Sequence, residues 1–134
     1  MTKRIGTRNT QQREALLEVL RRAGAFRSAQ ALHDEMKVGG SRAGLTTVYR
    51  NLQVLVNAGT VDVVSSVDGE SLYRLCDSER HHHHLLCRTC GSTVELENPE
   101  VESWADAAAK QHGFSAVTHT VELYGLCRGC SIAT

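Results

Sequence analysis

The sequence has few aromatic residues and no long apolar segment. Phe, Trp and Tyr make up 4% of the 134 residues, so a small core needs an additional stabilising element. No run of about 18 apolar residues occurs, which argues against a transmembrane helix, and residues 1–13 lack the apolar stretch of a signal peptide. These absences predict a soluble, cytoplasmic protein that does not bind membranes.

The net charge of zero hides a separation of charge along the chain. Residues 1–60 carry ten Lys or Arg and four Asp or Glu, a balance of +6, whereas residues 61–134 have a balance of −6. A basic half is typical of nucleic-acid binding, although drift in surface charge could produce the same separation. We therefore expect the two halves to face different partners.

Three short helices are predicted in the basic half. Apolar residues recur there at helical spacing in three segments, and each segment ends at a glycine. The segments are Thr10–Arg22 with Thr10 as its cap, residues 29–36 after a capping Ser28, and a stretch that opens at Thr46 or Thr47 and stops at Gly59. Tight connections between three helices suggest a helix-turn-helix, whose last helix would read DNA.

After residue 60 the pattern becomes strand-like. The segments VDVVSS and ESLYRL flank an Asp68-Gly69 turn, which predicts a hairpin, and a hairpin directly after a recognition helix is a wing. Strands are expected at 81–87, 92–97 and 116–124, with a helix from Pro99 to about His112. The predicted fold class is α+β, with a winged helix-turn-helix domain at 1–77 and a small α/β domain at 78–134.

Two cysteine pairs have the spacing of a metal site. Cys87-x2-Cys90 and Cys127-x2-Cys130 supply four thiolates, the set that tetrahedral structural zinc takes. Disulfides are not expected because cytosolic thiols are kept reduced. A redox pair like that of thioredoxin would need one CxxC in a βαβ setting and would leave the second pair unexplained. We therefore predict a structural zinc site.

A run of four histidines, His81–His84, lies inside the chain, where an affinity tag is not expected. In an extended segment alternate side chains point to opposite sides, so His82 and His84 would serve one site and His81 and His83 another. The candidates for the remaining ligands are Asp62 and Cys76 for the first site, and Glu102 and His119 for the second. Solvated carboxylates, a packed histidine and a buried thiol are the alternatives for these four residues.

Several motifs together resemble the ferric-uptake-regulator family of metal-dependent repressors. These are LTTVYRNLQVLVNAG, the wing, HHHHLLCRTCG and the terminal CRGC, and they span essentially the whole chain. The segments FRSAQALHDEM, GLTTVYR, GESLYR-x-C and HHHHLLC look like the zinc uptake regulator branch of actinobacteria. The resemblance implies a C-terminal dimerisation domain, a homodimer on an AT-rich inverted repeat of double-stranded operator DNA, and repression of zinc uptake genes when zinc is plentiful.

The resemblance also assigns the candidate ligands to three zinc sites. They are Cys87, Cys90, Cys127 and Cys130 for structural zinc; Asp62, Cys76, His82 and His84 for an interdomain sensing site; and His81, His83, Glu102 and His119 for a second regulatory site. Iron-responsive members commonly interrupt the histidine run with an acid. An uninterrupted run and a thiolate favour zinc over iron or manganese, while nickel stays possible.

The third helix also supplies candidates for DNA contacts. Side chains near the N-terminal end of such a helix reach base edges and phosphates, and here they are Thr46, Thr47, Tyr49 and Arg50. Tyr49 could instead pack against the preceding helix. The candidates for phosphate contacts are Arg8, Arg13 and Arg27, each of which could equally be a solvated surface charge.

Three other functions are alternatives to a zinc-responsive repressor. A metalloenzyme would keep one position on its zinc open, whereas each proposed site has four ligands and the sequence contains no HExxH, so no enzyme is predicted. A zinc-ribbon interaction module would leave the basic helix-turn-helix unused. A family member that senses iron, nickel or peroxide remains the alternative.

Overall fold

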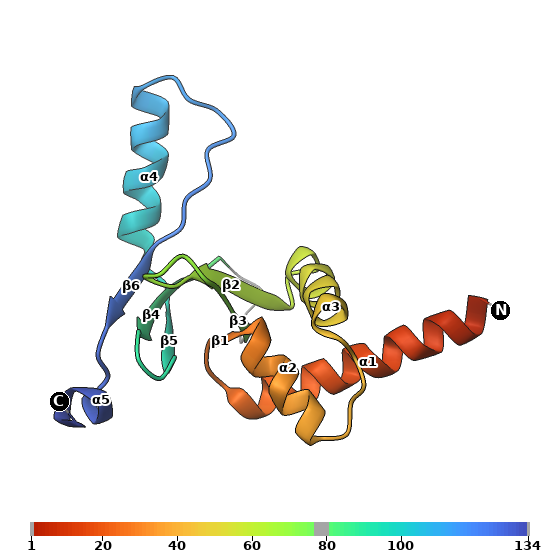
Figure 1. Ribbon diagram of the computed structural model, residues 1–134. Helices are drawn as coiled ribbons and strands as arrows, with labels where there is room; N and C mark the ends of the chain where they lie inside the picture. Colours follow the sequence, from red (N-terminus) through yellow and green to blue (C-terminus); the bar gives the residue numbers. More distant parts are fainter. Residues whose placement is uncertain (1, 77–80, 134) are drawn as a thin grey trace.

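A computed structural model describes the backbone of residues 2–76 and 81–133, which we call the N-terminal and C-terminal parts (Figure 1). Side-chain surroundings are described for residues 10–76 and 81–132. The predicted domain boundary between residues 77 and 78 lies outside the described residues. Within the described ranges, no helix has the length and apolar character needed to cross a membrane.

Three helices form the N-terminal part: α1 (Thr2–Ala23), α2 (Ala29–Val38) and α3 (Leu45–Asn57). Their apolar faces meet in one core, whose largest fully buried members are Leu16, Leu20, Leu32, Val48 and Leu52. The Ser28 hydroxyl accepts a hydrogen bond from the Ala31 N–H, which confirms the predicted cap.

The predicted starts of two helices are wrong. Residues 2–9 continue α1, so Thr10 lies within the helix and does not begin it. Helix α3 begins at Leu45, before both predicted threonines, with Gly44 in the cap position and no side-chain cap. A capping residue acts only where the preceding backbone leaves the helical conformation, and the sequence around these threonines does not show where that happens.

The wing is the predicted hairpin, and it gains a short third strand. Strands β2 (Val61–Ser65) and β3 (Ser71–Leu75) are antiparallel around the Asp68-Gly69 turn, where Gly69 has a φ of +85°. Strand β1 (Arg27–Ser28) pairs with β3 and gives the order β1-β3-β2. Two residues are too few for a strand pattern, so sequence reasoning missed β1.

The C-terminal part contains β4 (His83–Cys87), β5 (Thr93–Leu96), α4 (Pro99–Gln111), β6 (Glu122–Gly125) and α5 (Arg128–Ala133). Its sheet has the order β5-β4-β6, with β4 and β6 parallel. Pro99 begins α4 as predicted, and Asn98 caps it. The predicted strand at 116–124 is confirmed only at its end, since the backbone is left-handed at Ala116 (φ 54°) and β6 begins at Glu122. The α5 helix was not predicted.

The two faces of this sheet have different neighbours. In β4, His84 lies in register with Glu95 and Glu122, whereas Leu85 lies in register with Val94 and Leu123 on the opposite face. Leu86 is on the same face as His84 and packs against Phe26 and Val64 of the N-terminal part. The sheet therefore lies against the wing by one face, while α4 extends away from helices α1 to α3 (Figure 1).

Candidate metal centres

The four predicted cysteines meet at the far end of β4. Cys87 ends that strand, Cys90 lies in the turn that follows, and Cys127 and Cys130 come from the segment after β6. Their sulfur atoms all lie within 4.8 Å of one another, and Cys90 Sγ is 3.8 Å from Cys127 Sγ. A tetrahedral zinc with Zn–S bonds of about 2.3 Å requires sulfur atoms roughly 3.8 Å apart. The cluster therefore has the dimensions of a four-thiolate zinc site.

The charge state of the cluster also suits a cation. Backbone N–H groups of Cys127, Cys90 and Thr89 donate toward the Cys87 sulfur and lower the pKa of that thiol to about 6. Hydrogen bonds with the Cys127 and Cys87 sulfurs raise the pKa of Cys130 to about 12. Four thiolates at this spacing repel one another, so the full donor set becomes ionised only with a cation between the sulfurs.

A second cluster joins the two parts of the molecule. Asp62 belongs to β2 of the wing, and its Oδ2 atom lies 2.6 Å from His82 Nε2 and 2.9 Å from His84 Nε2. The Cys76 thiol, just after β3, shares a hydrogen bond with the same carboxylate. Both imidazoles are buried. The structure therefore brings the potential ligand atoms of Asp62, His82 and His84 within 4.8 Å of one another, whereas Cys76 contacts Asp62 but lies outside this group.

Electrostatics keep Asp62 charged despite its burial. Burial raises the pKa of the carboxyl group, but hydrogen bonds from His84, Cys76 and His82 outweigh it and hold the pKa well below its usual range. For Cys76, burial and then the hydrogen bond to Asp62 raise the pKa of the thiol to about 12. In the absence of a cation, Cys76 therefore retains its proton while Asp62 is ionised.

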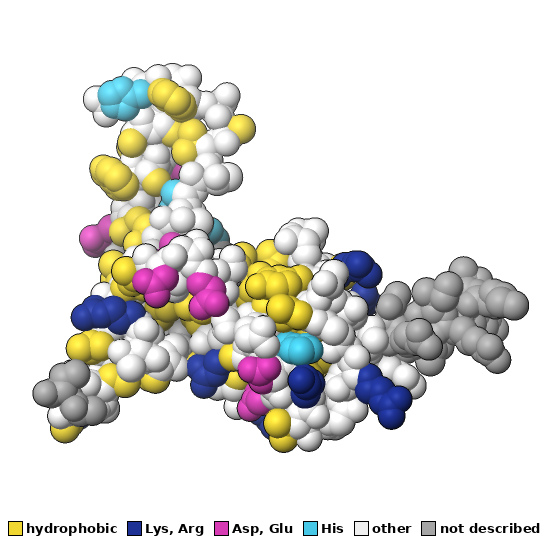
Figure 2. All heavy atoms as spheres, in the orientation of Figure 1, with side chains coloured by type: hydrophobic (Ala, Val, Ile, Leu, Met, Phe, Trp, Pro, Cys, Tyr) yellow, Lys and Arg dark blue, Asp and Glu magenta, His cyan; other side chains and the backbone are white. Residues whose placement is uncertain are grey.

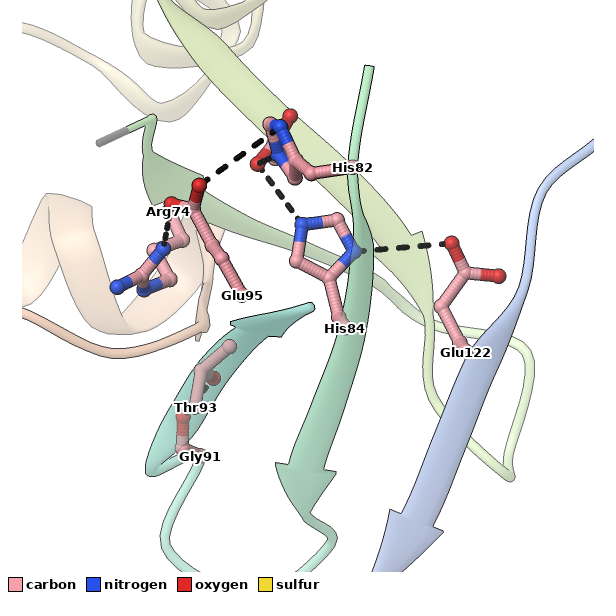
Figure 3. A network of polar contacts seen from close by, with 8 residues as sticks. Arg74, His82, His84, Gly91, Thr93, Glu95 and Glu122 are labelled. Carbon is pink, nitrogen blue, oxygen red and sulfur yellow. Dashed lines mark hydrogen bonds and ion pairs between the residues drawn. The ribbon is translucent and has the colours of Figure 1, made fainter. Parts of the chain in front are cut away.

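Acidic side chains lie behind the sensing histidines (Figure 3). His82 Nδ1 lies 3.7 Å from Glu95, and His84 Nδ1 lies 3.8 Å from Glu122. Arg74 of the wing forms a 2.7 Å ion pair with Glu95. Both histidine–carboxylate distances are longer than a hydrogen bond, and His84 Nδ1 has no hydrogen-bond partner among the described residues, so these carboxylates contribute negative charge near the rings. Sequence reasoning missed these three residues, because the positions of Glu95 and Glu122 beside His84 depend on strand register.

The third cluster lies within the C-terminal part. Glu102, on α4, has Oε1 2.9 Å from His83 Nε2 and 2.5 Å from His119 Nε2, and His81 Nε2 lies 3.1 Å from His119 Nε2. Burial raises the pKa of Glu102, but hydrogen bonds from His119 and His83 outweigh it and lower the pKa overall. A cavity of about 450 Å³ beside His81, His83 and Glu102 opens this cluster to solvent.

The predicted separation of the histidine run is confirmed as geometry. Even-numbered histidines lie beside Asp62, and odd-numbered histidines lie beside Glu102 and His119. Strand β4 begins only at His83, so the alternation extends two residues beyond the strand. His119 reaches its cluster from the segment before β6, not from a strand as predicted.

The predicted DNA contacts have different surroundings. On α3, Thr46, Tyr49 and Arg50 are exposed, and Thr47 is half-buried. Lys and Arg side chains are spread over the N-terminal part in Figure 2. Arg13 is half-buried, and the Arg27 guanidinium donates to the Cys90 carbonyl oxygen at 2.9 Å. The side chain of Arg8 lies outside the described residues. The DNA roles of these residues stay predictions.

Similarity to known proteins settles the family. The model of the "Ferric uptake regulator family" matches residues 4–124. The chain belongs to this family. Among its relatives is the zinc uptake regulation protein of Mycobacterium tuberculosis, with 53% identity over 125 residues, covering 93% of this chain and 95% of the relative. Family membership confirms the resemblance inferred from the motifs.

Solved structures of the family confirm the α+β fold. The crystal structure of FurB from M. tuberculosis, described as a zinc uptake regulator, matches with a TM-score of 0.55 and 53% identity, covering 93% of this chain and 96% of that one. A zinc uptake regulator complexed with zinc and DNA matches with a TM-score of 0.69 and 28% identity, covering 89% and 82%.

Proposed function

We propose that this family member is a zinc-responsive repressor that binds operator DNA as a homodimer and represses zinc uptake genes. The cluster of Asp62, His82 and His84 carries the proposal, because its residues come from both parts of the molecule, and we assign Cys76, which contacts Asp62, as its fourth ligand. Two imidazoles, a carboxylate and a thiol suit a borderline-soft ion such as zinc. The 53% identity to a zinc uptake regulation protein supports the same metal.

In this proposal, the sensing cluster selects the relative position of the two parts. A bound zinc ion supplies positive charge that Asp62 and the two histidines can share only when the wing lies against the C-terminal sheet. Shifting such an equilibrium from 1:99 to 99:1 needs about 5.5 kcal/mol of differential binding. The FurB structure has the higher sequence identity to this chain but the lower TM-score of the two zinc regulators. A difference in the relative position of the two parts between structures would account for this.

The other two clusters take complementary roles. We assign structural zinc to Cys87, Cys90, Cys127 and Cys130, whose sulfur spacing fits it. We assign a second regulatory zinc to His81, His83, Glu102 and His119, which stiffens the C-terminal part and exchanges through its open cavity. With Cys76 counted at the sensing site, each assigned site has four protein donors and reserves no position for an activated water. The protein is therefore assigned as a cytoplasmic regulator and not as an enzyme.

The homodimer rests on the exposed apolar surface of the C-terminal part. Leu85, Val94 and Leu123 form a row across its sheet and are 42%, 54% and 49% exposed. Trp104 on α4 is 70% exposed, and that helix has no buried residue. Figure 2 shows apolar side chains along the extension that contains α4. A second copy would cover this surface and present two α3 helices to an inverted repeat.

The decisive experiment is a zinc titration of operator binding under metal buffering, in parallel with iron, manganese and nickel. Zinc is expected to promote binding at the lowest free concentration. His82→Ala should abolish the response while the structural zinc and the dimer remain, and His81→Ala should shift only its threshold or maximum. Equal loss in both variants, or a stronger response to another metal, would contradict the proposal. Metal content after mild peroxide treatment separates a zinc sensor from a peroxide sensor.

A further inference from the structure

The turn that carries Cys87 and Cys90 lies directly against the N-terminal part. The Phe26 N–H donates to the Gly91 carbonyl oxygen at 3.1 Å, and the Arg27 guanidinium donates to the Cys90 carbonyl oxygen at 2.9 Å. The Gly91 N–H in turn donates to the Cys87 carbonyl oxygen at 2.9 Å. One short segment thus contains two cysteines of the four-sulfur cluster and two carbonyl oxygens that accept hydrogen bonds from the DNA-binding part.

The contact is so close that it requires glycine at position 91. A Cβ atom on Gly91 would lie 2.4 Å from the Phe26 carbonyl oxygen and 3.0 Å from Arg27 Nη1. Gly91 also has a φ of +79°, a backbone conformation that L side chains rarely adopt. Any other residue would push the two parts of the molecule apart.

Apolar packing supports the same contact. Phe26 is 2% exposed and packs with Val64 of the wing and with Leu86, the neighbour of Cys87. The Phe26 ring also meets the His84 ring edge-on, with ring centres 5.2 Å apart. Phe26 therefore contacts both the cysteine turn and a residue of the sensing cluster.

From these contacts we propose that the turn from Cys87 to Gly91 is a docking surface for the DNA-binding part. Phe26, Arg27 and Gly91 act as positioning residues that hold the winged helix in the orientation that fits the operator. The part of this inference that concerns operator binding rests on the proposed function. Disruption of the four-cysteine site would consequently weaken DNA binding even in molecules that remain dimeric. In this proposal, Arg27 contacts the cysteine turn of the same chain and does not contact a DNA phosphate.

A matched pair of glycine variants tests the docking surface in the full-length, zinc-loaded protein. Gly91→Ala and Gly113→Ala both place alanine at a positive φ in the C-terminal part, but a Cβ on Gly113 meets nothing within 4 Å. Amide hydrogen exchange at Phe26 reports the contact without DNA, and operator affinity at saturating zinc reports its consequence. Gly91→Ala should speed the exchange and weaken operator binding roughly tenfold each, whereas Gly113→Ala should change neither.

Arg27→Met provides a second test that leaves the cysteine turn unaltered, in case Gly91→Ala does not retain its zinc. It should speed Phe26 exchange while preserving the dimer and the structural zinc. If it instead weakens binding to all DNA, flattens the salt dependence and leaves Phe26 exchange unchanged, Arg27 is a phosphate contact and the proposal is overturned. Identical behaviour of Gly91→Ala and Gly113→Ala would also overturn it. Absence of zinc-dependent operator binding in the unmodified protein would count against the proposed function, while Phe26 exchange would still test the docking surface.

Discussion

The two parts of the molecule bury their apolar residues in different ways. The N-terminal part has its own core, in which Leu16, Leu32 and Leu52 are fully buried. In the described C-terminal part the buried apolar residues are Leu86 and Cys87, and Leu86 packs on the N-terminal part. Since apolar burial is the main force in folding, the first part is stabilised mainly by its own core. We expect the second part to depend on the proposed metal ions and on the proposed dimer contact for its stability.

The largest expected effect comes from removing one thiolate of the cysteine cluster. Cys127→Ser should release the structural zinc, abolish the dimer and eliminate cooperative unfolding of the C-terminal part, while the N-terminal helices still unfold cooperatively. Calorimetry, metal analysis and sedimentation measure these changes. Cys76→Ser, outside this cluster, is the control and should keep the structural zinc and the dimer. A Cys127→Ser protein that remains dimeric, with an unchanged unfolding profile, would remove the contrast between the two parts.

A charge in the apolar row of the C-terminal sheet should have the next largest effect. Leu85→Asp puts a carboxylate between Val94 and Leu123, where the partner would have to desolvate it. The dimer dissociation constant should rise about a hundredfold, as expected for the centre of an interface. Val38→Asp, at an 89% exposed position of α2, should leave it unchanged in sedimentation experiments. Equal effects of both variants would place the dimer contact elsewhere.

Truncation in the N-terminal core should destabilise only that part. Leu16 is completely buried, so Leu16→Ala should lower the free energy of unfolding of the N-terminal part by about 2–5 kcal/mol. Denaturant titration measures this, and sedimentation should show an intact dimer. The control Val38→Ala should change stability by no more than about 0.5 kcal/mol. Loss of the dimer in Leu16→Ala would show that the two parts do not have separate sources of stability.

The smallest expected effect concerns the contact between the parts at low pH. The pKa of Asp62 is lowered in the folded protein, so its carboxylate contributes stability above the unfolded value of about 4, and this is lost as the pH falls below it. Metal-free protein should lose more stability between about pH 5 and 3 than Asp62→Asn does. Asp34→Asn, on the exposed side of α2, should follow the unmodified protein. Parallel pH profiles for all three would show that Asp62 is not stabilised in the fold.

Local patterns accounted for much of the fold and for the grouping of the ligands. Helical periodicity located α1, α2 and α3, and the Asp68-Gly69 turn located the wing. Strand alternation separated His82 and His84 from the other two histidines before any partner was placed. These features depend on backbone geometry over a few residues, and this geometry produces a recognisable spacing of residue types in the sequence. Helix starts were less predictable because the neighbouring backbone decides whether a threonine caps.

By itself, the sequence determined the residue types at the three clusters, the side of the chain on which each histidine of the run lies and the separation into a basic and an acidic half. Only the tertiary structure decided that Glu95 and Glu122 lie behind the sensing histidines, that Arg74 pairs with Glu95 across the two parts, and that Gly91 contacts Phe26. The reason is physical. Those contacts join residues far apart in the chain, and their distances depend on strand register and on how two folded surfaces pack, which no local pattern encodes.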